Sequence, residues 1–191
     1  IFAVGIVDDI RTCVTSDFKT EGNLVYLVGK QTEKELGGSE YYNMMKMEGG
    51  IVPKTDPEIL KHCIKGLLAC MKKHYVVACH DLSEGGLGIG LVEMAIGGNI
   101  GTTIDISEVN KELRPDVKLF SESNTRWIAE AKKDKQTEFE KQLQKDHVGF
   151  ILLGKTNGDH LIIKDDAKTV VNLSVDVLRE CWRKPIWDFM G

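Results

Sequence analysis

The sequence predicts a mixed α/β domain, a β-sheet with helices packed on it. Three observations favour this fold class. First, 191 residues with 42% hydrophobic content suit a single hydrophobic core. Second, short apolar runs typical of strands alternate along the chain with segments whose apolar residues recur at helical spacing. Third, glycine pairs and capping residues occur at the boundaries between the predicted strands and helices.

The elements of the first half follow from local patterns. The sharpest is a helix after Thr55 or Asp56, either of which can cap it, because Pro57 suits a first turn and apolar residues then recur at helical spacing to Met71. The first residue lies inside an apolar run, so we expect the chain to be part of a longer polypeptide. In order, we predict a strand at residues 1–7, a strand at 24–28, a short helix opened by Gly37-Gly38-Ser39 that reaches Met45, and the helix after Asp56.

The second half alternates in the same way. A short buried strand and a tight loop precede an apolar helix that Gly97-Gly98 ends. Asn157-Gly158 between two apolar runs is the strongest short-range hairpin signal, and Ser174 can cap a final helix. The predicted elements are a strand at 76–79, a helix at 87–96, strands at 100–106 and 126–131 with a polar loop at 120–125 between them, a polar surface helix at 134–145, strands at 148–154 and 160–164, and the final helix.

Charge, hydropathy and cysteine usage exclude several classes of protein. The chain has 25 basic and 29 acidic side chains, a net charge of -4, which is too balanced to predict a nucleic-acid partner. No stretch approaches the roughly 20 apolar residues of a membrane span, and no signal peptide is recognisable, so we expect no membrane partner and a cytoplasmic location. No two of the five cysteines are spaced as C-x-x-C, so neither a disulfide framework nor a zinc site is predicted. Cys63 and Cys70 should be buried on one helix face.

One motif matches a phosphate loop by its letters alone. Residues 149–156 fit the pattern G-x-x-x-x-G-K-T. A true phosphate loop wraps phosphates with its backbone and runs directly into a helix. Here the four variable positions are Phe, Ile, Leu and Leu, and a turn follows Thr156. We therefore interpret the segment as a strand that binds no nucleotide.

Asp81 is the first candidate functional residue, at the end of a buried strand. Ser83 follows it, and Gly85 and Gly86 stand at a helix start. The backbone N–H groups there favour phosphate, and Asp81 can hold a magnesium ion that bridges the same phosphates. The alternative is that Asp81 or Ser83 only caps the helix while the glycines make the turn. Cys79 and His80 are not expected to share a metal with Asp81, because adjacent side chains of a strand point to opposite faces.

Two further loops combine small or hydroxyl residues with charge. One opens a helix with two glycines and a serine, and it permits the same anion site or the same capping role. The other carries hydroxyls, a carboxylate and an arginine, a set suited to sugar hydroxyls and phosphate or to a solvated loop. The candidate residues are Gly37, Gly38 and Ser39 in the former loop and Ser121, Glu122, Ser123 and Arg126 in the latter.

In this order, the three loops resemble the last domain of phosphoribosylformylglycinamidine synthases. The wider superfamily includes aminoimidazole ribonucleotide synthetase, thiamine monophosphate kinase, selenophosphate synthetase and a hydrogenase maturation protein, and its members share mainly the Asp-x-Ser-x-Gly-Gly loop. The sequences LGGSEY at 36–41 and FSESNTR at 120–126 resemble the purine enzyme more specifically. The resemblance covers essentially the whole chain.

The resemblance implies a fold, a domain position and a reaction. The fold would be a three-layer α/β/α mixed sheet, as in the C-terminal domain of aminoimidazole ribonucleotide synthetase. Residues 1–15 would be the tail of a preceding synthetase domain, and residues 16–191 the C-terminal domain of the second of two tandem copies. The reaction would be the ATP-dependent conversion of formylglycinamide ribonucleotide and ammonia to formylglycinamidine ribonucleotide, with ATP and Mg²⁺ as cofactors. Because no glutaminase sequence follows Gly191, the chain resembles the small form, whose partners are a separate glutaminase subunit and a small third subunit.

The family's catalytic histidine lies in domains that precede this one, so no catalytic residue is expected here. By resemblance, Asp81 would bind magnesium and Ser83 the nucleotide. The loop with Ser121 and Ser123 would correspond to a substrate loop of the first copy, and whether it contacts substrate, a structural nucleotide or nothing is open. We expect the 191-residue chain to fold but to be inactive alone. The alternatives are another superfamily member, such as aminoimidazole ribonucleotide synthetase, and a packing module that binds no ligand.

Overall fold

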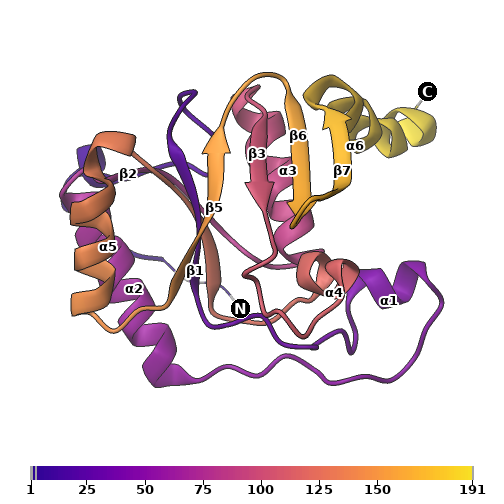
Figure 1. Ribbon diagram of the computed structural model, residues 1–191, viewed down its shortest axis with the longest axis horizontal. Helices are drawn as coiled ribbons and strands as arrows, with labels where there is room; N and C mark the ends of the chain where they lie inside the picture. Colours follow the sequence, from indigo (N-terminus) through magenta and orange to yellow (C-terminus); the bar gives the residue numbers. More distant parts are fainter. Residues whose placement is uncertain (1, 3, 191) are drawn as a thin grey trace.

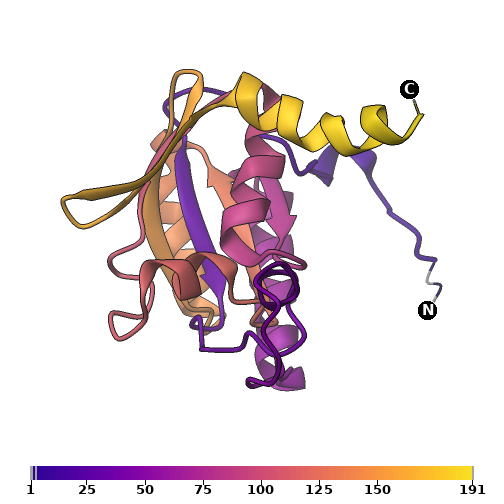
Figure 2. The same ribbon diagram turned by 90° about the vertical axis from the view of Figure 1, so that its right-hand side faces the viewer.

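Seven strands form one mixed sheet with helices on both faces in the computed structural model, which describes residue 2 and residues 4–190 (Figures 1 and 2). The strand order is β2-β4-β1-β5-β3-β6-β7, and in this described part each neighbouring pair is antiparallel except β3 with β6. The strands are β1 (Leu24–Gly29), β2 (Val76–Asp81), β3 (Thr102–Asp105), β4 (Arg126–Ala131), β5 (Phe150–Thr156), β6 (His160–Asp165) and β7 (Lys168–Ser174). The helices are α1 (Glu40–Met44), α2 (Pro57–Lys72), α3 (Gly86–Gly98), α4 (Pro115–Phe120), α5 (Gln136–Lys145) and α6 (Val175–Met190), with 3₁₀ turns η1 (Ile10–Thr12) and η2 (Lys133–Lys135).

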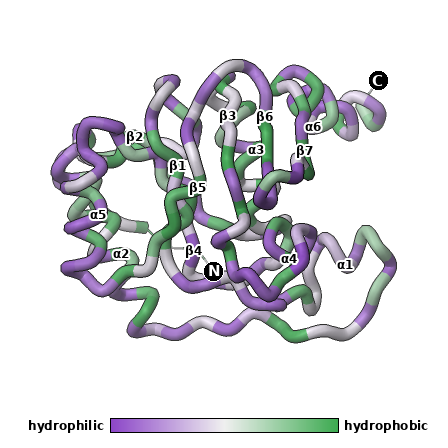
Figure 3. The backbone as a smooth tube through the Cα atoms, in the orientation of Figure 1, coloured by the Kyte–Doolittle hydropathy of each residue, from purple (hydrophilic) through white to green (hydrophobic). Residues whose placement is uncertain are grey.

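The sheet separates two hydrophobic clusters of the described residues, because successive side chains of a strand point to opposite faces. On β1, Val25 and Leu27 belong to the cluster with α3 and α6, whereas Tyr26 and Val28 belong to the cluster with α2 and α5. Figure 3 shows that hydrophobic residues are frequent along α3, whereas most residues of α5 are hydrophilic. This α/β/α arrangement confirms the predicted fold class.

Helix α2 begins and packs as the sequence predicts. The Asp56 carboxylate accepts hydrogen bonds from the backbone N–H of Glu58 at 2.9 Å and of Ile59 at 3.2 Å, which makes it the N-cap. Cys63 and Cys70 are buried on the inner face, as expected. Within the described residues, no helix combines the length and the apolar character needed to span a membrane.

Helix α3 continues past its predicted end at Gly97-Gly98 and stops at Asn99, whose φ of 54° closes the helix. The glycines have a packing role instead. A Cβ atom on residue 98 would lie 2.1 Å from the carbonyl oxygen of Phe18. Gly98 therefore allows the segment before β1 to lie directly against the helix.

The hairpin predicted around Asn157-Gly158 is wrong. Gly158 does form a turn, with φ of 59°, but β3 lies between β5 and β6 and pairs with both. The Gly101 N–H donates to the Gly158 carbonyl at 2.7 Å, and the Asn157 N–H donates to the Gly101 carbonyl at 2.9 Å. Because a Cβ atom on residue 101 would lie 2.3 Å from the His160 carbonyl oxygen, the glycine lets β3 enter this gap. The local hairpin is formed by β6 and β7 instead.

The strand predicted at residues 1–7 is also wrong in its described part, and residues 1 and 3 lie outside the described residues. Phe2 and residues 4–7 form no strand, and their side chains are exposed. The segment reaches the sheet only at Thr15, which forms a parallel bridge to Ala78 on β2. Apolar composition alone could not show that this run lacks a neighbouring strand. Three elements were not expected, namely η1, α4 and the edge strand β7.

Candidate functional site

The three candidate loops meet at one end of the sheet. They follow β1, follow β2 and precede β4, and the antiparallel pairing of β4 with both strands brings these ends together, with Gly29 opposite Arg126 and Asp81 opposite Trp127. Figure 1 shows α1 and α4 beside each other at this end. The topology therefore gathers residues that are about 40 positions apart along the sequence.

Asp81 and Ser83 form an exposed pair at the end of β2. The Ser83 hydroxyl donates to Asp81 Oδ2 at 2.8 Å, and Asp81 Oδ1 makes no hydrogen bond to the described residues. The N-cap of α3 is Gly85, which provides no side-chain cap. The capping alternative for Asp81 and Ser83 is therefore wrong, and both side chains face solvent.

Gly85 and Gly86 form the tight turn into α3, with φ of 74° and 60°. The loop before β4 covers this turn. A Cβ atom on residue 86 would lie 2.4 Å from the Ser121 carbonyl oxygen and 2.9 Å from that of Leu119. The Gly85 N–H donates to Glu122 Oε1 at 2.9 Å. The first turn of α3 thus already holds a carboxylate from another loop.

The turn at Gly37, Gly38 and Ser39 is held from inside the protein. The Gly37 N–H donates to the Ile51 carbonyl at 2.9 Å, while Gly38 is exposed with φ of 78°. The buried Ser39 hydroxyl accepts from the Tyr42 N–H at 3.2 Å, so it caps α1. The capping role considered for Ser39 is confirmed.

The third loop points inward rather than into solvent. The Ser121 hydroxyl donates to the Glu33 carbonyl at 2.6 Å, and Ser123 Oγ accepts from the Glu33 N–H at 3.1 Å. Both serines are fully buried. These two hydroxyls, which the sequence suggested for binding sugar, instead hydrogen-bond this loop to the segment after β1. The interpretation of the loop as solvated is therefore wrong for both serines.

Arg126 is the largest fully buried side chain among the described residues. Its guanidinium donates to the carbonyls of Ser123 at 2.7 Å and Ser121 at 2.6 Å, and to the Thr32 hydroxyl at 2.8 Å. Burial lowers the pKa of Arg126 to about 10, an effect that the nearby Glu35 carboxylate opposes. The guanidinium therefore stays charged at neutral pH and serves as a buried clamp. Nothing in its sequence position distinguishes this role from phosphate binding.

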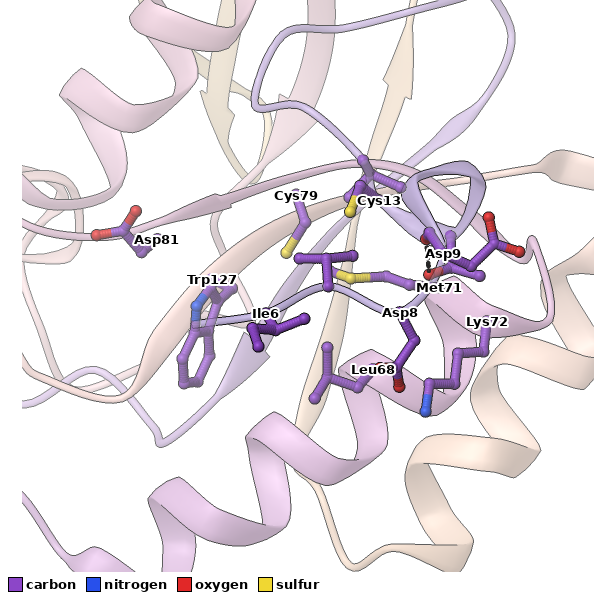
Figure 4. A pocket seen from close by; sticks show the side chains of 13 residues that line it. Ile6, Asp8, Asp9, Cys13, Leu68, Met71, Lys72, Cys79, Asp81 and Trp127 are labelled. Atoms are coloured by element: carbon purple, nitrogen blue, oxygen red, sulfur yellow. Dashed lines mark hydrogen bonds between the residues drawn. The ribbon is translucent and has the colours of Figure 1, made fainter. Parts of the chain in front are cut away.

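A groove of about 740 Å³ adjoins Asp81, and no pattern in the sequence indicated it. Leu68, Met71, Cys79 and Trp127 line it together with residues 6–9 and 12–14, on both sides of η1. Figure 4 shows Asp81 at one end of the groove, beyond Trp127 and with its carboxylate turned away from Cys79 and Met71. Burial raises the pKa of the Cys79 thiol to about 12, so the side chain is a neutral thiol at neutral pH. The groove was missed because its residues come from the N-terminal segment, α2, β2 and β4, which only the tertiary fold brings together.

The donor set restricts the kind of metal site. Among the described residues, no group of three or more His, Cys, Asp or Glu side chains could hold a metal ion. Magnesium does not require such a group, since it is often held by one or two carboxylates together with phosphate oxygens and water. The exposed Asp81 carboxylate fits Mg²⁺ only as one ligand beside the phosphates of a nucleotide.

Comparison with known proteins identifies the family of this domain. Residues 20–166 match the family described as "AIR synthase related protein, C-terminal domain". The chain belongs to this family. Among solved structures, this AIR synthase-related domain is similar to Thermotoga maritima PurL complexed with FGAR, with a TM-score of 0.78, 19% identity, and coverage of 88% of this chain and 29% of that chain. A thiamine-monophosphate kinase from Stenotrophomonas maltophilia is less similar, with a TM-score of 0.56, 13% identity, and coverage of 82% and 54%. At these identities the likeness shows the fold alone.

Relatives with higher identity share one name, "Phosphoribosylformylglycinamidine synthase subunit PurL". The protein of Alkaliphilus metalliredigens is 37% identical over 181 residues, which is 94% of this AIR synthase-related chain and 24% of the relative. That of Thermoplasma acidophilum is 36% identical over 182 residues, 95% of this chain and 23% of the relative. The chain thus spans about a quarter of the length of the curated relatives it matches.

Proposed function

We propose that the chain is the C-terminal domain of the ATP-dependent synthetase subunit of phosphoribosylformylglycinamidine synthase. This enzyme would convert formylglycinamide ribonucleotide, ATP and ammonia derived from glutamine to formylglycinamidine ribonucleotide, ADP and phosphate in purine biosynthesis. The observation that carries the proposal is the 37% identity over 94% of the chain with a protein of that name. The cytoplasmic location remains a prediction. The match favours this function over aminoimidazole ribonucleotide synthetase.

The proposal includes partners and a domain position. Because the relatives are about four times longer than their matching part, the remaining synthetase domains would belong to the same polypeptide. Residues 1–15 would be the tail of the preceding synthetase domain, and residues 16–191 would be the C-terminal domain of the second copy. A separate glutaminase and a small third subunit are further proposed partners, supported by a similar chain in the "Structure of PurLQS from Thermotoga maritima".

Within this domain we propose that Asp81 binds Mg²⁺ and Ser83 meets a phosphate of the nucleotide. Support comes from their exposure, from the free Asp81 Oδ1 and from the adjacent groove. Gly37, Gly38, Ser39, Gly85 and Gly86 would lie along the phosphates of the same nucleotide. When bound, Mg-ATP would supply charge and phosphate oxygens, while this chain would only hold them, since no catalytic residue is assigned here. The internal bonds of Ser121, Ser123 and Arg126 favour a structural role for their loop.

The test is nucleotide binding by the full-length subunit. Asp81→Ala should lower the affinity for Mg-ATP at least about tenfold, the amount expected when a charged contact worth about 1.5–3 kcal/mol is lost. Ser83→Ala should lower it less. Glu84→Ala is the matched control, because Glu84 is an exposed carboxylate of the same loop. Unchanged Mg-ATP affinity in both the Asp81 and Ser83 variants would contradict the proposed site.

A further inference from the structure

Helix α6 has one apolar face, and the domain covers only the first part of it. The residues of this face are spaced three or four positions apart, so they lie along one side of the helix: Val175, Leu178, Trp182, Ile186 and Phe189. Val175 and Leu178 are buried in the cluster with α3, whereas each of the other three side chains is more than half exposed. The face that packs on the domain therefore continues beyond the edge of the domain.

The distal part of α6, residues 180–190, is exposed along its whole length. Isolated helices shorter than about 12–15 residues are marginal in water. Pro185 lies within this part and weakens it further, because proline cannot donate a backbone hydrogen bond to the preceding turn. The distal part therefore needs a covering surface if it is to stay helical.

The segment before η1 presents a second apolar surface on the same side of the sheet. Figure 2 shows this segment and the distal part of α6 both projecting away from the sheet on the side of α3. Its apolar side chains Val4, Ile6 and Val7 are all exposed. Exposed apolar surface of this kind marks an interaction site, and a body that lies on this side of the sheet would meet both surfaces.

The comparisons and the chain path indicate what covers these surfaces. The family match ends at residue 166, before α6. The match to the Alkaliphilus metalliredigens relative extends over 94% of the chain, which is too long to leave out all 16 residues of α6. Part of α6 is thus shared with relatives about four times longer than their match. A domain joined to the segment before η1 would be held beside α6 at a high effective concentration, which favours it over a second copy of the chain.

We propose that the distal part of α6 and the segment before η1 form the docking surface for the domain that precedes this one in the same polypeptide. The inference rests on the domain position in the proposed function. Trp182 is the anchor of this surface, because a large indole on the apolar face buries the most area when it is covered. Trp187, five positions further on, lies toward the other side of the helix and stays outside the contact.

The test is amide hydrogen exchange of α6 in the full-length subunit, in its Trp182→Ala and Trp187→Ala variants, and in the 191-residue chain. Amides of the distal part should exchange at least about tenfold more slowly in the full-length subunit than in the 191-residue chain, because docking suppresses local unfolding of the helix. Trp182→Ala should lose most of this protection. Trp187→Ala is the matched control, since it removes the same side chain from the other side of the helix, and it should keep the protection. Amides of β4 should exchange equally in all four proteins, which checks that the sheet is intact.

Several results would overturn the proposal. One is equal exchange of the distal part in the full-length subunit and the 191-residue chain, and another is an equal effect of the two tryptophan substitutions. Protection of the 191-residue chain that rises with its concentration would assign the surface to a second copy instead. Protection that appears only when a separate glutaminase subunit is added would assign it to that subunit. These measurements use neither nucleotide nor substrate, so failure here is distinguishable from failure of the proposed function.

Discussion

Glu130 is a buried carboxylate that hydrogen-bonds the segment immediately before β1. Its oxygens accept the Lys19 N–H at 2.7 Å, the Thr20 N–H at 3.1 Å and the Asn23 side-chain amide at 2.6 Å. The residue is fully buried on β4. Burial raises the pKa of its carboxyl above the ordinary 4.5, although these hydrogen bonds and Lys19 act against the rise. The hydrogen bonds of Glu130 therefore stabilise the fold, whereas the burial of its ionised carboxylate costs free energy.

We predict that Glu130→Gln lowers the free energy of unfolding by about 1–3 kcal/mol, because the amide NH₂ would face a buried backbone N–H and leave it unpaired. The loss should be larger at pH 5 than at pH 8. A carboxyl whose folded pKa is raised gives its full stability below the unfolded pKa and loses it as the pH rises through the folded value. Urea denaturation of both proteins at the two pH values measures this difference. A loss that grows with pH would show that the sign is wrong.

Element β5 shows how structural context decides what a motif means. Phe150–Thr156 carries most of the phosphate-loop pattern, yet it is a strand in the interior of the sheet, between β1 and β3. Lys155 is an exposed side chain on this strand, opposite Thr103 on β3 and Leu24 on β1. Its amide and carbonyl serve the ladder and are not arranged around an anion.

We predict that Lys155→Ala leaves Mg-ATP affinity and turnover of the full-length subunit unchanged. The unfolding free energy should change by no more than about 0.5 kcal/mol, as is usual for surface positions. Binding titrations and a denaturation curve measure both, with Asp81→Ala as the variant that should respond. A large loss of ATP affinity in folded Lys155→Ala protein would restore the phosphate-loop interpretation.

Local signals predicted the elements better than their pairing. The cap of α2, the core of β1 and the bounds of β4 agree with the sequence patterns. The hairpin at Asn157-Gly158 failed because a turn signal says nothing of a third strand that pairs between its arms. The candidate site was likewise predictable from local signals but not from tertiary contacts. The loops were recognisable one by one, whereas the bond from Glu122 to Gly85 depends on tertiary contacts.

At the scale of the whole molecule, α2 is apolar on two faces. Its inner face packs on the sheet, and its outer face exposes Ile64 and Leu68, which lie four positions apart and line a second groove. Such a helix is expected to be covered on both sides. The outer face therefore favours an association that the 191 residues do not themselves provide.

We predict that the isolated chain self-associates as its concentration rises, and that Leu68→Lys reduces this association. The side chain is 50% exposed, so the variant should stay folded. Leu173→Lys on β7, where the leucine is 43% exposed, is the matched control on another element and should associate like wild type. Sedimentation velocity over a range of concentrations measures the effect. Equal association of wild type and Leu68→Lys would exclude α2 as the surface responsible.

The insertion of β3 between β5 and β6 has a consequence for the order of folding. Its two neighbours, β5 and β6, come later in the sequence and are joined to each other by a tight turn. That turn favours direct zipping of β5 onto β6, and a chain that zipped in this way would have to reopen before Thr102–Asp105 could enter. The β6–β7 hairpin carries no such conflict, because it is local in sequence. We therefore expect the rate at which this half of the sheet forms to depend on closing the long connection between β3 and β5, which contains α4, β4 and α5 and makes the pairing non-local.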